Sequence, residues 1–310
     1  MPRTEYKKKY FSMTNLSDYI SEQLYKHLCI DYELYENAGL YNGIEDLCRF
    51  LTNKIRTHQE KEFTISYKST DRELSKFDNI FFKSIILKCE RSNKNRDDGE
   101  YLNNSEFDYD SNESKLRFVN IKLYLSQTHN AQEVYSILLH EITHAWDSYN
   151  SFKKGTTTIG QAFRDAKYSK ILDLMDNTKN NDGVVLGTIL YFLNNVEVNA
   201  WVAGFAGYLY DYLETNEIKT PHEALRVIKQ SNLYENYVNI GVWVNALYNG
   251  KLNRARTTGL CNEYNKLYGT NYTESKIKKL LYSKYEKVKN KIDSSIGKLC
   301  TRYVKEVIIR

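Results

Sequence analysis

The sequence is poor in proline and cysteine. Only 2 of its 310 residues are proline, whereas 27 are tyrosine. Together with many Lys, Asn and Ile residues, these biases point to an AT-rich genome rather than to a binding mode. The 5 cysteines are scattered and form no C-x-x-C pair, so they do not predict a zinc site built from thiolates. An odd, dispersed set of cysteines favours free thiols in a reducing compartment.

The sequence also lacks a long uninterrupted apolar segment. Residues 1–9 are basic, but no apolar segment of signal-peptide length follows them. The longest apolar run, residues 184–213, is interrupted by polar residues between 194 and 199. It therefore predicts one buried helix, or two halves of one, rather than a membrane span. We expect a cytoplasmic protein without a membrane span, or one in the host cytoplasm or associated with a particle if the source is viral.

Charge of one sign gathers at the C-terminal end. The net charge of +5 is a weak bias toward acidic partners, but residues 276–310 hold eleven Lys or Arg against three acids. This basic tail is most simply the solvated face of a helix, with Ile277, Leu280, Leu281, Tyr285, Val288 and Ile292 packed below. The alternative is a surface for an acidic partner or anionic lipid. Nucleic acid is the less favoured partner because the chain carries no nucleic-acid-binding motif.

One stretch carries a specific chemical pattern, the H-E-x-x-H of His140, Glu141 and His144. It lies in residues 130–149, whose apolar positions recur every three or four residues and so predict a helix. Asn130 is the expected N-cap, and Glu133 completes a capping-box-like pair. Residues four apart lie on one face of a helix, so the two imidazoles can be aimed at one metal ion. Glu141 is placed to contact a water on that metal rather than the metal itself.

In this motif the chain resembles the zincin superfamily of zinc metallopeptidases. The resemblance implies that His140 and His144 bind one Zn²⁺ per chain and that Glu141 is the general base and proton shuttle. It implies hydrolysis of peptide bonds, in a protein or peptide substrate, by a zinc-activated water.

A catalytic zinc site typically has three protein ligands, and the third is expected downstream. The metzincin pattern needs Gly at 147 and His at 150, where this chain has Asp147 and Asn150. Glu197 is an isolated acid within an apolar helix, where an unpartnered carboxylate costs several kcal/mol to bury. Its E-x-x-A spacing to Ala200 resembles the third-ligand helix of gluzincin peptidases, although 53 residues separate it from His144, more than in compact gluzincins.

Other interpretations of these acids stay open. Asp165 and Asp147 are the alternative third ligands, and Asp147 is better suited to hold a ligand imidazole by its other nitrogen. Glu197 could instead pair with a buried Lys or Arg. An oxyanion also needs a donor besides zinc, and the sequence does not choose among the candidates, which are Tyr191, Tyr208, Tyr210, Tyr237, His222 and His129.

The expected fold is α+β and zincin-like. A small mixed sheet (strands 62–67, 80–87 and 116–125, with a polar surface loop over 91–114) precedes the H-E-x-x-H helix and a mostly helical C-terminal half. In zincins, an edge strand borders the cleft and pairs with the substrate.

Three regions are predicted along the chain. Residues 1–60 form a helical N-terminal segment, with helices over 16–29 and 44–55. Residues 61–215 form the zincin-like core, which includes a helix over 161–175, and residues 216–310 form a helical region with the basic tail. The function expected is that of a zinc metallopeptidase. The alternative is a zincin-fold structural or binding component of a larger assembly, with a non-catalytic metal.

Overall fold

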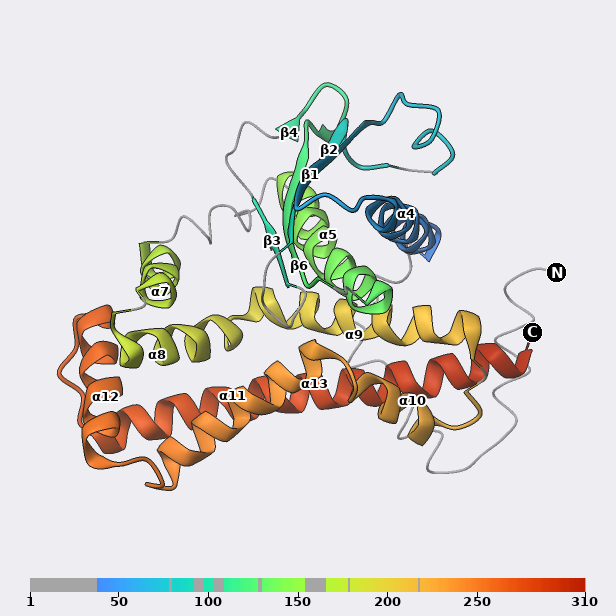
Figure 1. Cartoon of the computed structure of the whole chain (residues 1–310). Coiled ribbons are helices and arrows are strands. Elements are labelled where there is room, and N and C mark those ends of the chain that lie inside the picture. The colour runs from blue at the N-terminus through green and yellow to red at the C-terminus, as the bar shows by residue number, and fades with distance from the viewer. Residues whose placement is uncertain are drawn as a thin grey trace.

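The protein has an α+β fold in which a small mixed sheet and its helices lie against a larger group of helices (Figure 1). The structure, a computed structural model, describes residues 38–77, 80–91, 98–102, 109–127, 130–153, 166–177, 179–216 and 218–309. We call residues 38–153 the sheet lobe and residues 166–309 the helical lobe. The helix predicted over 16–29 lies outside the described residues, and the three-region division stays a prediction.

The sheet lobe is built from a four-stranded sheet with the order β1-β2-β6-β3. Strand β2 is antiparallel to β1 and parallel to β6, and β3 pairs antiparallel with β6 at the edge. A separate pair, β4 and β5, completes the strands. Their bounds are Glu62–Lys68 (β1), Ser84–Arg91 (β2), Asp98–Tyr101 (β3), Tyr109–Asp110 (β4), Lys115–Leu116 (β5) and Val119–Leu125 (β6).

Two helices, α4 (Ala38–Thr57) and α5 (Ala131–Lys153), share one apolar core with this sheet. Every second residue of β6 is buried, which is the period-2 pattern of a strand with one face on a core. Leu51 and Ile55 of α4 and Leu138 and Ile142 of α5 are fully buried in the same cluster. The prediction of a helix over 44–55 is confirmed, and the real helix is longer.

Strand predictions succeeded where the sequence alternates and failed where it does not. The strand expected over 62–67 is β1, whereas the one expected over 80–87 begins later, at Ser84. The strand expected over 116–125 is divided into β5 and β6. The loop predicted over 91–114 was wrong in part, since β3 and β4 lie within it. Such short polar strands depend on backbone pairing with a neighbour, which leaves no apolar period in the sequence.

Of the two alternatives for residues 184–213, one buried helix or two halves of one, the helical lobe has two half-helices. The chain breaks at Leu193 and Asn194, between α8 and α9. A Thr220–Glu223 capping box is present at the start of α10. The helices of this lobe are α7 (Ala166–Asp176), α8 (Asn181–Phe192), α9 (Asn195–Thr215), α10 (Pro221–Ile228), α11 (Asn232–Tyr248), α12 (Arg254–Tyr268) and α13 (Glu274–Ile309).

The two lobes meet where α5 packs on α9. The Ser136 hydroxyl of α5 donates a hydrogen bond of 2.7 Å to the Gly204 carbonyl of α9. A Cβ at Gly207 would lie 3.0 Å from Leu139 Cδ2 and 3.2 Å from Tyr135 Cε1. The small residues of α9 therefore let the two backbones approach closely.

Many lysines of the basic tail lie on the exposed face of helix α13. Its apolar residues Ile277, Leu281, Tyr285, Val288 and Ile292 are buried in the helical-lobe core, and lysines such as Lys276, Lys279, Lys287 and Lys291 are exposed. Leu280 was wrongly placed in that core, because it is 42% exposed. An acidic partner for the lysines stays a prediction.

Two further expectations concern membranes and cysteines. Across the described residues, no helix has the length and apolar character needed to cross a bilayer. The four cysteines in the described part of the chain, Cys48, Cys89, Cys261 and Cys300, are free thiols and are buried.

Candidate metal centre

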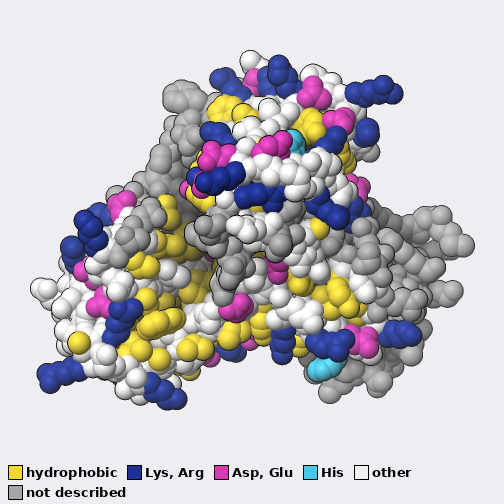
Figure 2. Space-filling view, viewed as in Figure 1, with side chains coloured by type: hydrophobic (Ala, Val, Ile, Leu, Met, Phe, Trp, Pro, Cys, Tyr) yellow, Lys and Arg dark blue, Asp and Glu magenta, His cyan; other side chains and the backbone are white. Residues whose placement is uncertain are grey.

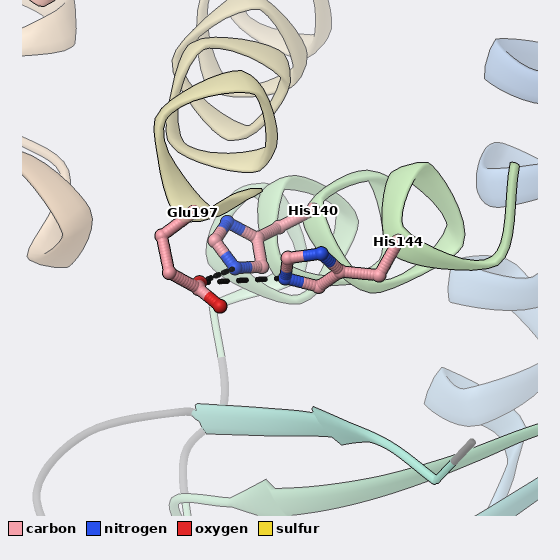
Figure 3. A group of neighbouring side chains, drawn as sticks. All are labelled: His140, His144 and Glu197. Carbon is pink, nitrogen blue, oxygen red and sulfur yellow. Dashed lines mark ion pairs between the residues drawn. The ribbon is translucent and has the colours of Figure 1, made fainter. Parts of the chain in front are cut away.

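Three side chains from two helices converge on one point between the lobes. His140 and His144 project from α5, one turn apart, and Glu197 projects toward them from the first turn of α9 (Figure 3). Their possible ligand atoms all lie within 4.8 Å of one another. Among the described residues, this is the group of His, Cys, Asp and Glu side chains whose geometry could hold a metal ion.

The spacing of the three groups fits a tetrahedral zinc ion. Glu197 Oε2 lies 3.6 Å from His140 Nε2 and 3.4 Å from His144 Nε2. Two ligand atoms bound about 2.1 Å from a tetrahedral zinc lie about 3.4 Å apart, which is close to both distances. Two imidazoles and one carboxylate are also a ligand set that zinc accepts. The residues present therefore fit the metal that the motif implies.

The site is buried, and its charges depend on one another. His140, His144 and Glu197 are 7%, 3% and 0% exposed. Burial by itself raises the pKa of Glu197, but the two imidazoles outweigh it and hold the pKa far below its ordinary value. Burial by itself lowers the pKa of His144, but Glu197 and, more weakly, Asp147 raise it overall. Glu197 thus stays a carboxylate near neutral pH, the form that a metal needs.

Glu141 lies beside this group rather than within it. Its carboxylate Oε1 is 3.9 Å from His140 Nε2, and the side chain is 8% exposed. The backbone of β3 runs past the same carboxylate, since a Cβ built on Gly99 would lie 3.3 Å from Glu141 Oε1. The four residues predicted for the site, His140, Glu141, His144 and Glu197, are therefore brought together by the fold.

Two residues at the site were not predicted. Trp201 is one turn after Glu197 on α9, and its ring packs edge-on against His140 with centroids 5.9 Å apart. The four-residue spacing from Glu197 was a signal that could have found it. Gly99 of β3 left no such signal, because it falls in the polar segment predicted as a loop.

Several of the other candidates have different surroundings or fall outside the described residues. Asp147 is not one of the three clustered groups, and burial raises its pKa to about 6 against the opposing effects of His144 and Lys291. His222 is exposed in the first turn of α10. The hydroxyl of Tyr237 donates a 2.7 Å hydrogen bond to Asp293. Asp165 and His129 lie outside the described residues.

Comparison with known proteins adds no name to this arrangement: no family model, no curated protein and no solved structure matches the chain.

Proposed function

We propose that this protein is a zincin-type zinc metallopeptidase of the gluzincin kind, with His140, His144 and Glu197 as ligands. The observation that carries the proposal is the convergence of these three groups, with the Glu141 carboxylate beside them. Burying two imidazoles and a carboxylate would be costly without a common cation. A hydrolytic role accounts for Glu141 as well, because a general base must lie next to the reacting water.

The residues would divide the chemistry as follows. Zinc, when bound, would act as a Lewis acid that makes water nucleophilic near neutral pH and polarises a carbonyl. Glu141 would accept the proton of the attacking water and deliver it to the leaving amine. Trp201 would limit the movement of the His140 ring by packing against it. Burial of all four polar side chains would keep bulk water away from these charges.

The surroundings of the site supply a place for a peptide. Strand β3 is the last strand of the described sheet, in the order β1-β2-β6-β3. In zincins, the strand in this position pairs with the extended substrate, and we assign that role to β3. Figure 2 shows apolar side chains gathered in a hollow between the sheet lobe and the helices at lower left, which would accommodate apolar side chains of the substrate.

The test combines metal content with activity. Purified wild type should contain about one zinc per chain and cleave an unstructured protein such as casein. The Glu141→Gln variant should keep its zinc and lose about 10²–10⁴-fold in rate, because the amide cannot accept the proton. Asp173→Asn, which alters an exposed carboxylate on α7, is the control and should keep wild-type activity. Undiminished cleavage by Glu141→Gln would remove the proposed base.

A structural metal site is the second candidate, and the near-complete burial of the three ligands favours it. Closed structural sites fill all four positions with protein ligands, whereas the described residues bring together three, with Glu141 as a fourth polar neighbour. The structural interpretation predicts zinc in the wild type without cleavage. It also predicts that Glu141→Gln weakens zinc binding rather than activity.

A further inference from the structure

A glycine of β3 lies directly against the candidate active-site helix α5. Gly99 is the second residue of β3 and lies opposite Leu123 of β6. Directly opposed residues of an antiparallel pair point to the same face, and Leu123 is 1% exposed in the sheet-lobe core. Any side chain at position 99 would therefore point from β3 into α5.

The space at that point is already filled by two residues of α5. A Cβ built on Gly99 would lie 2.5 Å from Ile137 Cγ2 and 3.0 Å from Glu141 Cγ. Both atoms are near the start of their side chains, so neither can move away without a shift of a rotamer or of the helix. The carboxylate oxygen Glu141 Oε1 would be 3.3 Å away. Glycine is thus the residue that lets the β3 backbone lie directly against Glu141.

From this geometry we infer that Gly99 is a positioning residue for Glu141, an inference that rests on the proposed function. The β3 backbone lies along one side of the Glu141 side chain, and the carboxylate lies 3.9 Å from His140 Nε2. A strand this close removes rotamers that would carry the carboxylate away from the metal group. A base held within a narrow range of geometry transfers protons faster than one that samples several rotamers.

The inference extends to the substrate. If the outer edge of β3 pairs with the peptide, the same four-residue strand holds the base and the scissile bond at a fixed separation. A side chain at position 99 would change that separation by pushing β3 from α5. The expected signature is a loss in kcat rather than in zinc affinity, because the atoms nearest a Cβ at Gly99 belong to Ile137 and to the Glu141 base.

The first test needs no activity. Unfolding temperatures are measured for wild type, Gly99→Ala, Glu141→Ala and the double variant. The side chain of alanine ends at Cβ, so Glu141→Ala lacks both Glu141 atoms that an alanine at position 99 would meet. Gly99→Ala should lower the unfolding temperature less in the Glu141→Ala background than in wild type. An equal decrease in unfolding temperature in both backgrounds would overturn the inferred contact between position 99 and Glu141.

The second test distinguishes a displaced Glu141 base from a steric clash between position 99 and Ile137. Ile137→Ala removes the Cγ2 atom that an alanine at 99 would strike. The double variant Gly99→Ala/Ile137→Ala should keep one zinc per chain and the KM of Ile137→Ala, yet have at least about a tenfold lower kcat than that single variant. Recovery of kcat to the level of Ile137→Ala would overturn the inference and leave Gly99 a packing residue.

A matched control and a separate outcome complete the design. Gly297 of α13 is exposed, and a Cβ there meets no atom within 4 Å, so Gly297→Ala should leave kcat and zinc content unchanged. A wild type that binds zinc but cleaves nothing would overturn the proposed function and with it the assignment of Glu141 as base. The unfolding cycle would still decide whether Gly99 and Glu141 are coupled.

Discussion

The two lobes contribute to the candidate metal centre in unequal ways. The sheet lobe supplies both histidines, Glu141 and the strand beside it, whereas the helical lobe supplies one carboxylate, Glu197. Helix α9 belongs to both cores, since Val198 and Phe205 pack in the helical lobe and Ala203 packs in the sheet lobe. The comparison shows how 53 residues can separate His144 from Glu197: α7 and α8 occupy that interval, and α9 returns to α5.

The lobes also differ in what holds them together. The sheet lobe has strands with buried alternate positions, whereas the helical lobe is a cluster of helices whose ends are fixed by side-chain caps such as Thr220, Ser231 and Asn253. The two lobes pack against each other where α5 contacts α9. Experiments that act on one lobe at a time can therefore show whether the metal centre depends on the contact between them.

The largest effect is expected from the carboxylate of the helical lobe. Glu197→Ala leaves two histidines on α5, so zinc affinity should fall by more than about a hundredfold, beyond the cost of losing a residue that only supports a ligand. Competition with a chelator measures the affinity, and elemental analysis measures the content. Asp165→Ala and Asp173→Ala serve as comparisons and should keep one zinc per chain. Loss of zinc in Asp165→Ala and not in Glu197→Ala would move the third ligand to Asp165.

A smaller effect is expected from separating the lobes without touching a ligand. Gly207→Val adds a Cβ and two methyl groups against Leu139 and Tyr135, which should lower the free energy of unfolding by about 1–3 kcal/mol. Zinc affinity should weaken with it, because α9 carries Glu197. Denaturant unfolding and chelator competition measure the two quantities. Gly297→Val changes helix propensity equally but meets no neighbour, so it should leave both nearly unchanged. Equal free energies of unfolding and equal zinc affinities for the two variants would show that the α5–α9 contact can accommodate a valine at position 207.

The pH dependence should give the smallest effect, about tenfold in zinc affinity per pH unit per proton displaced. The pKa of His144 is higher in the folded protein than its ordinary value of 6.5, so protonated His144 stabilises the zinc-free fold. This stabilisation is complete below about pH 6.5 and is lost as pH rises through the raised pKa. The pKa of Glu197 is lower in the folded protein than its ordinary value of 4.5, so the Glu197 carboxylate also stabilises the zinc-free fold. This stabilisation is complete above about pH 4.5 and is lost as pH falls toward the lowered pKa. Zinc-free protein should therefore be most stable between about pH 4.5 and 6.5.

Zinc should move that optimum upward, because the metal replaces the proton on His144. Thermal unfolding between pH 4 and 9, with a chelator or with zinc, measures both curves. Glu197→Gln removes the charge that shifts His144, so the zinc-free optimum should flatten in this variant. Superimposable curves with and without zinc would contradict a metal at these residues.

Much of the candidate metal centre could be predicted from local sequence. The H-E-x-x-H spacing places two imidazoles on one face because α-helical periodicity is a property of the backbone. Glu197 was identifiable because an isolated acid in an apolar helix needs a partner when buried. The alternation in β1 was likewise read from apolar and polar patterning, which reports the side of an element that is buried. For residues 184–213 the same patterning left one helix and two half-helices as alternatives.

The tertiary structure decided what depends on distant pairing. Residues 98–101 have no apolar period, so their strand exists because β6 supplies an edge for backbone hydrogen bonds. The role of Gly99 then follows from its distance to Ile137 and Glu141, which no spacing along the chain encodes. The sequence by itself determined which groups could bind zinc. Only the packing of α5 against α9 and β3 determined that these groups lie within reach of one another, because helix and strand periodicity fix directions within an element and not distances between elements.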